Sequence, residues 1–173
     1  ATRLVFSYGA FAGDIYIDDF AFIQPDVSYE VISLTPEEKK QVLTAEMGRW
    51  IAGMMEVTAT KVSAWDVVNE AISGSDYDRD GYYDLQSAQW GDANCFYWQD
   101  YLGSEDYVRI AIAHARKYYE QFGGTKPLKL FINDYNLESD WDDNKKLKSL
   151  IHWIGIWESD GVTKVDGIGT QMH

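Results

Sequence analysis

The chain has 173 residues, a formal net charge of −13 and an aromatic share of 15%, with 7 Trp and 12 Tyr. This length suffices for a domain with a sizeable core. The acidic balance disfavours nucleic acid and anionic membrane surfaces as partners, because both carry negative charge. No stretch reaches the ~18 consecutive apolar residues of a membrane-spanning helix. The single cysteine, Cys95, can form neither an internal disulfide nor a cysteine metal site.

The N-terminal stretch, residues 1–27, has the pattern of β-structure. Apolar runs at 4–6 and 15–23 are separated by a turn rich in glycine. Two strands alone are marginally stable in water, so we interpret this stretch as the tail of a β-sandwich. Residues 13–20 resemble the final strand of carbohydrate-binding modules. The chain starts at Ala1 without a signal peptide, which is typical of a processed or excised piece.

A helix is predicted to begin after Thr35. Thr35 is the expected N-cap, Pro36 occupies the first helical position and Glu38 completes a capping box. One face carries apolar residues at helical spacing, and we expect this face to lie in the core. Its members are Leu43, Met47, Trp50, Ile51 and Met54.

The next apolar run, residues 65–70, predicts a strand that ends on Asn69 and Glu70. In a regular strand, side chains alternate between the two faces. Asp66, Val68 and Glu70 are therefore expected on one face, and Trp65, Val67 and Asn69 on the other. A long loop at 71–103 follows, and loops of this length in compact domains are usually functional or disordered.

Two further helix and strand pairs complete the predicted order. Ser104 is the expected cap of a helix that ends at Gly123, and strand 128–132 follows it. Another helix precedes a last strand at 165–173. The predicted core residues of the two helices are Val108, Ala111, Ile112, Ala115, Tyr118 or Tyr119, Phe122, Leu147, Leu150, Ile151, Ile154 and Trp157.

Strands that alternate with helices over residues 28–173 predict an α/β domain with a parallel sheet. Polar residues gather where each strand ends: Asn69 and Glu70, then Asn133 and Tyr135, then Gln171 and His173. A (β/α) barrel places its active site at this end, and so does a doubly wound open sheet. No glycine-rich phosphate loop follows any strand, which disfavours nucleotide binding.

Two constellations are candidates for chemistry. Asp66 and His173 could approach each other from nearby strands, and a carboxylate beside a histidine orients the imidazole and tunes its charge. The alternative for His173 is a core histidine with satisfied hydrogen bonds. Separately, Asp76, Asp78, Asp80 and Asp84 have the spacing of a calcium loop. The twelfth position is Ser87 where a bidentate glutamate is expected, so a solvated acidic loop is the alternative.

With these strand ends in view, residues 34–173 resemble family 10 glycoside hydrolases, the retaining endo-1,4-β-xylanases. The motifs that match the family's fourth, fifth and sixth barrel strands are residues 65–72, 131–138 and 166–173. Residues 101–108 are similar to the start of its fourth helix. The resemblance implies a partial (β/α)8 TIM barrel, about strands 4 to 6 with their helices, preceded by the β-sandwich segment.

The resemblance also implies roles for the residues at the strand ends. Glu70 would be the general acid/base, which protonates the leaving glycosidic oxygen and then deprotonates water. Asn69 would hydrogen-bond the sugar 2-hydroxyl, and Gln171 and Tyr135 would line the same subsite. His173 would bridge Asp66 and the nucleophile. Such chemistry needs two carboxylates about 5–5.5 Å apart and a covalent glycosyl intermediate.

The family's nucleophile glutamate belongs to a seventh strand, and no counterpart lies within these 173 residues. We therefore expect a middle piece of a xylanase that is inactive alone, with xylan or xylo-oligosaccharides and the remaining segments of the enzyme as partners. No cofactor is expected beyond a structural calcium ion, and the family implies a secreted or cell-surface location. A non-catalytic glycan-binding protein and a related β-glycanase acting on another polysaccharide are the alternatives.

Overall fold

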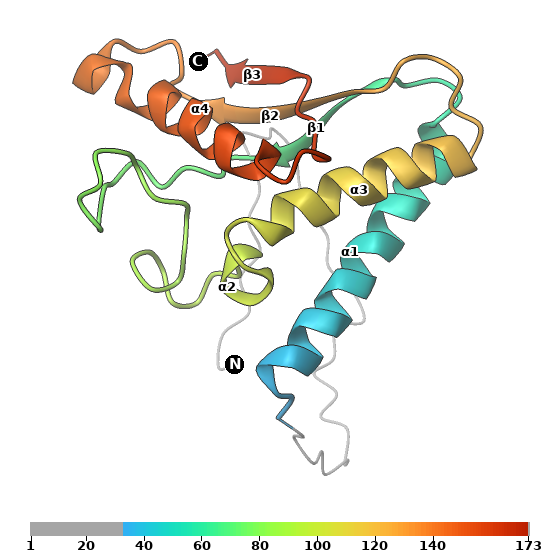
Figure 1. Ribbon diagram of the computed structural model, residues 1–173, viewed down its shortest axis with the longest axis horizontal. Coiled ribbons are helices and arrows are strands. Elements are labelled where there is room, and N and C mark those ends of the chain that lie inside the picture. Colours follow the sequence, from blue (N-terminus) through green and yellow to red (C-terminus); the bar gives the residue numbers. More distant parts are fainter. Residues whose placement is uncertain (1–32, 173) are drawn as a thin grey trace, which may run out of the picture. The chain divides into compact units, whose positions relative to one another are not determined.

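The computed structural model describes residues 33–172 (Figure 1). The predicted β-sandwich tail at 1–27 lies outside the described residues, and so does His173. The described elements are α1 (Pro36–Thr58), β1 (Ala64–Asn69), α2 (Gln99–Leu102), α3 (Asp106–Gln121), β2 (Lys129–Tyr135), the 3-10 turn η1 (Trp141–Asn144), α4 (Lys145–Glu158) and β3 (Gly167–Gln171).

The three strands form one parallel sheet in the order β1-β2-β3, as the alternation of helices and strands predicted. Along β2 the alternate residues Leu130, Ile132 and Asp134 are fully buried, whereas the residues between them are exposed or half-buried. This period of two indicates that one face of the sheet is sealed and the other is partly open. Figure 1 shows α1, α3 and α4 on the same side of the sheet.

The start of α1 has the predicted capping box. The Thr35 hydroxyl accepts from the Glu38 backbone N–H at 3.2 Å, and Glu38 accepts from the Thr35 N–H at 2.8 Å. The predicted core face is only partly right, because Trp50 is 69% exposed and Met54 37%. Helix α1 packs mainly on α3, and the stripe it buries there is Met47, Gly48 and Met55.

Helix α3 buries the predicted face: Val108, Ala111, Ile112, Ala115 and Tyr119. The predicted cap is wrong, because the helix begins after Glu105 without a side-chain cap. Ser104 instead offers its carbonyl oxygen to the Trp157 indole N–H at 2.9 Å. Gly123 ends the helical segment with a φ of +82°, a conformation that glycine adopts at little cost.

Helix α4 buries Leu150 and Trp157 as predicted, but Ile151 is 55% exposed. Lys146 and Ser149 are also buried, although the predicted stripe did not include them. Both have polar partners: the Ser149 hydroxyl accepts from the Tyr83 backbone N–H at 2.8 Å, and Lys146 pairs with Asp134. Buried polar groups are tolerated when they are paired in this way.

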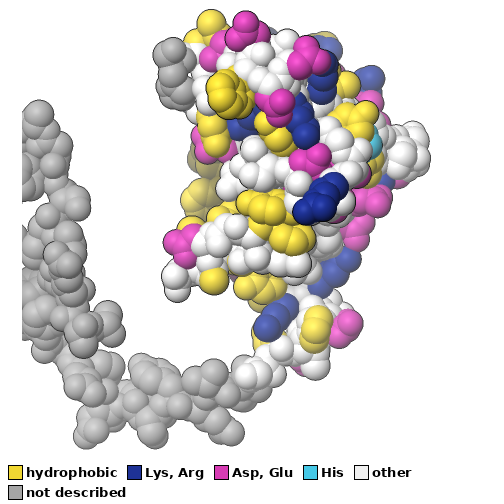
Figure 2. All heavy atoms as spheres, turned by 90° about the vertical axis from the view of Figure 1, so that its left-hand side faces the viewer, with side chains coloured by type: hydrophobic (Ala, Val, Ile, Leu, Met, Phe, Trp, Pro, Cys, Tyr) yellow, Lys and Arg dark blue, Asp and Glu magenta, His cyan; other side chains and the backbone are white. Residues whose placement is uncertain are grey.

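Acidic, basic and apolar side chains are interspersed on the face of the described residues that Figure 2 presents. Among the described residues, no helix combines the length and the apolar character that crossing a membrane requires.

Candidate active site

A β-bulge in β1 sets the direction of the candidate site residues. Asp66 pairs with Phe131 and Val68 with the next residue of β2, Ile132, so Val67 is an extra residue without a partner. Asn69 consequently pairs with Asn133 and faces the same side of the sheet as Asp66. The regular alternation predicted for this strand is therefore wrong beyond Asp66. The bulge turns Asn69 towards the partly open face of the sheet.

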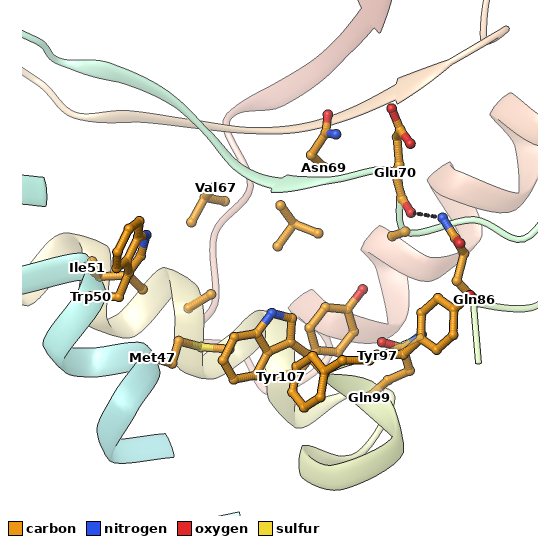
Figure 3. A pocket seen from close by; sticks show the side chains of 15 residues that line it. Met47, Trp50, Ile51, Val67, Asn69, Glu70, Gln86, Tyr97, Gln99 and Tyr107 are labelled. Carbon is orange, nitrogen blue, oxygen red and sulfur yellow. Dashed lines mark hydrogen bonds between the residues drawn. The ribbon is translucent and has the colours of Figure 1, made fainter. Parts of the chain in front are cut away.

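Glu70 follows β1 in a left-handed backbone conformation, with φ +54°. Few residues other than glycine adopt this conformation, and it often occurs at functional sites. The Glu70 N–H donates to the Asn133 carbonyl at 2.7 Å, and the Glu70 carbonyl accepts from the Gln86 side-chain amide at 2.5 Å. Figure 3 shows this second bond, with the Glu70 carboxylate pointing away from Gln86.

Side chains from all three strands meet in one hydrogen-bond network. The Gln171 amide donates to Glu70 Oε1 at 2.9 Å and to Asn69 Oδ1 at 3.1 Å. The Asn133 amide donates to the same Asn69 oxygen at 2.7 Å. Two donors thus fix the orientation of the Asn69 amide, and its NH2 group is left to serve another acceptor. Asn69, Glu70 and Gln171 were predicted to lie together, and the structure places them within hydrogen-bond distance.

Two glycines of β3 make room for side chains of β2. A Cβ atom at Gly169 would lie 2.7 Å from Asn133 Oδ1, and one at Gly167 would lie 2.7 Å from the Phe131 ring. Asn133 and Phe131 occupy the space that the two glycines leave. The hydrogen-bond network around Asn69 therefore requires a glycine at position 169, because any larger residue would displace Asn133.

Tyr135 pairs with Gln171 in the strand register, but its ring has a different contact. The Lys146 ammonium lies 3.2 Å from the ring centroid and 2.7 Å from Asp134 Oδ1. The contact between Lys146 and Asp134 is an ion pair, and among the described residues Lys146 Nζ has no hydrogen-bond partner. Asp134 also accepts backbone N–H groups from Ile72 at 3.1 Å and from Tyr135 at 2.9 Å.

Sequence reasoning missed Gln86, Asp134 and Lys146. Asp134 could have been found, because it follows Leu130 and Ile132 at the buried alternate positions of β2. A carboxylate at such a position indicates a buried charge with a partner. Nothing in the spacing of Gln86 or Lys146 indicated their contacts, because these bonds join residues 16 and 12 positions apart through tertiary structure.

A pocket of about 420 Å³ lies beside β1. Figure 3 shows Asn69 and Glu70 at one side, and Met47 and Trp50 of α1 at the other. Tyr97 of the loop before α2 and Gln99, the first residue of α2, contribute to its wall. A second hollow of about 600 Å³ is lined by Tyr135, Asn136, Trp141 and Lys146, together with Ser73, Gly74, Tyr83 and Ser139. In Figure 3 the side chains of Asn69 and Glu70 point away from the wall that Met47 and Trp50 form, so the hydrogen-bond network does not face into the first pocket.

The acidic loop brings together three of its four predicted ligands. Oxygens of Asp76, Asp78 and Asp84 lie within 4.8 Å of one another, whereas Asp80 is not in this group. The Lys145 ammonium contacts Asp76 Oδ2 at 2.9 Å and lowers the pKa of that carboxyl. Asp76 Oδ1 is buried without a hydrogen-bond partner among the described residues. The arrangement fits a hard cation in part, and calcium stays a prediction.

Asp66 is exposed on β1. Its predicted pairing with His173 involves a residue outside the described part, so that pairing stays a prediction.

A parallel sheet that presents Asn69, Glu70 and Gln171 where its strands end has its polar residues at the edge where (β/α) barrel enzymes place their active sites. The family model described as Glycosyl hydrolase family 10 matches residues 29–173. The chain belongs to glycosyl hydrolase family 10. Its described elements are accordingly part of a TIM barrel, as the resemblance implied.

Relatives and solved structures agree with this membership. Endo-1,4-beta-xylanase A of Halalkalibacterium halodurans is 32% identical over 160 residues, which cover 91% of this chain and 34% of that protein. Endo-1,4-beta-xylanase 2 of Claviceps purpurea is 37% identical over 115 residues, 65% of this chain and 27% of that protein. The crystal structure of xylanase B from Clostridium stercorarium F9 matches with a TM-score of 0.59 and 26% identity, over 82% of this chain and 35% of that one. The chain thus spans about a third or less of the length of the relatives it matches.

Proposed function

We propose that this chain is part of a retaining endo-β-1,4-xylanase in which Glu70 is the general acid/base. The observation that carries the proposal is the network that joins Glu70 and Asn69 at the end of β1 to Gln171 at the end of β3, in one parallel sheet. The Gln171 amide holds Glu70 Oε1 and leaves Oε2 to deliver a proton to a leaving oxygen. Endo-1,4-β-xylanases among the family relatives support xylan as the substrate class.

The other residues of the site have supporting parts in this proposal. The Asn69 amide, fixed through its oxygen by Gln171 and Asn133, directs its NH2 group to a sugar hydroxyl. Tyr135 presents an aromatic surface for the sugar ring. A retaining mechanism needs a second carboxylate about 5–5.5 Å from the first. The proposal assigns that nucleophile to a segment of the enzyme outside residues 1–173, with His173 and Asp66 orienting it.

Partners and location follow from the substrate. One relative of known structure, 28% identical to this chain with a TM-score of 0.55, is described in complex with xylotriose; the match covers 78% of this chain and 33% of that one. We infer xylan and xylo-oligosaccharides as ligands here. Because xylan is a polymer too large to cross a membrane, the enzyme would act outside the cell or at its surface.

The test is reducing-sugar release by the full-length enzyme from xylan, cellulose and mixed-linkage glucan. The wild type is expected to prefer xylan, and Glu70→Gln is expected to lose at least ~100-fold in kcat, because the amide cannot donate an acidic proton. The matched control is Glu120→Gln, at an exposed position of α3. Undiminished activity of Glu70→Gln would overturn the assignment. A preference for another glucan would replace the substrate, and binding of xylan without turnover would make the protein a glycan-binding module.

A further inference from the structure

The backbone at Glu70 makes hydrogen bonds of its own, separate from those of its carboxylate. Glu70 has a φ of +54°, which brings it out of the line of β1. In this conformation an L-residue has its Cβ atom close to the following carbonyl, so the turn needs external support. The direction of the carboxylate depends on that support, because the side chain of Glu70 starts from the turn itself.

Gln86 supports the turn from the returning part of the long loop. Its side-chain amide donates to the Glu70 carbonyl at 2.5 Å, and its backbone N–H donates to the Ala71 carbonyl at 2.9 Å. The two bonds fasten consecutive carbonyl groups of the turn to a single residue. Gln86 does not bond to the Glu70 carboxylate, so it can affect proton transfer by that carboxylate only through the backbone of Glu70.

The position of Gln86 is itself fixed. Ile72 and Leu85 form an isolated antiparallel bridge, and the Ser73 N–H donates to the Asp84 carbonyl at 2.8 Å. Ile72 is fully buried and Leu85 is 5% exposed. A short antiparallel ladder therefore runs beside the turn and presents the Gln86 amide to Glu70 from a packed base.

We propose that Gln86 is a positioning residue for the acid/base: its amide fixes the left-handed turn that aims the Glu70 carboxylate at Gln171 and the scissile oxygen. The inference rests on the proposed role of Glu70. The alternative is a purely structural bond that keeps the loop folded. A positioning role affects proton donation, whereas a structural role affects stability and all substrates alike.

Gln86→Met in the full-length enzyme separates these roles, since methionine has a similar length and no donor. The control is Gln89→Met, at an exposed position of the same loop. Misplacement of a reacting group by ~1 Å can cost ~100-fold in rate, so kcat on xylan should fall ~10- to 100-fold with KM within ~2-fold of wild type. With a dinitrophenyl xylobioside, whose leaving group departs without a proton, kcat/KM reports formation of the glycosyl intermediate and should fall less than ~3-fold.

Gln86→Asn keeps the amide but shortens the side chain by one methylene. It should also lose more activity on xylan than on the activated substrate, and the loss on xylan should be smaller than in Gln86→Met. Equal losses on both substrates, or no loss on xylan, in either variant would overturn the proposal. Glu70→Ala, measured in parallel, distinguishes the two levels of the argument. If Glu70→Ala spares kcat/KM on the activated substrate and the losses of the Gln86 variants in kcat/KM do not differ between substrates, only the positioning role fails. If Glu70→Ala keeps full activity on xylan, the proposed function fails.

Discussion

Gly169→Ala offers a sharp test of how closely packed the site is. A Cβ atom at this position would lie 2.7 Å from Asn133 Oδ1, so the contact must open by about 0.7 Å to reach ordinary van der Waals distance. Asn133 holds Asn69 through a 2.7 Å hydrogen bond and cannot move that far without weakening it. Displacements of this size in a substrate-positioning group correspond to a loss of roughly 10- to 100-fold in rate. Overpacking should also cost about 1–3 kcal/mol of stability.

The assay is kcat/KM of the full-length enzyme on xylan, measured beside the melting temperature. The matched control is Gly155→Ala on α4, where an added Cβ atom meets nothing within 4 Å. This control should keep wild-type kcat/KM and gain about 0.5–1 kcal/mol, because alanine is the better helix former. A Gly169→Ala enzyme with wild-type kcat/KM would refute the reasoning that Asn133 must stay in place for Asn69 to act.

Two further predictions concern charged groups near the site. Asp134→Ala leaves the buried Lys146 ammonium unpaired and should cost about 3–5 kcal/mol in denaturant unfolding; Lys146→Met in the same chain should restore part of this, and additive losses would contradict the pairing. Calcium should raise the melting temperature, and a chelator should lower it again, more strongly in Lys145→Met than in wild type, because the ammonium competes for Asp76. Melting curves unaffected by calcium in both proteins would remove the ion from the account.

The order of helices and strands could be predicted from sequence because each signal is local. The capping box at Thr35 needs only residues three apart, and Gly123 ends its helix through its own backbone freedom. The polar strand ends were also visible, since a parallel sheet brings such ends to one edge. These signals were sufficient to predict from the sequence that Asn69, Glu70 and Gln171 lie together.

Side-chain direction was less predictable, because it depends on tertiary contacts. The extra residue Val67 reverses the expected facing of Asn69, and no local pattern marks a bulge among β-branched residues. Trp50 and Ile151 fit the helical period but are exposed. The period predicts which residues share one face of a helix, but it does not predict which of them a neighbouring element covers. Gln86 was invisible for the same reason: its partner is distant in the chain, and its own sequence environment is an ordinary loop.

The most direct test of the central claim, that Glu70 is the acid/base of a retaining mechanism, is azide rescue of Glu70→Ala in the full-length enzyme. With a dinitrophenyl xylobioside the glycosyl intermediate should form without the acid and then accumulate, because no base activates water. Azide needs no base, so it should accelerate turnover and give the β-configured xylobiosyl azide. Turnover that azide leaves unchanged, or an azide product of inverted configuration, would contradict the claim.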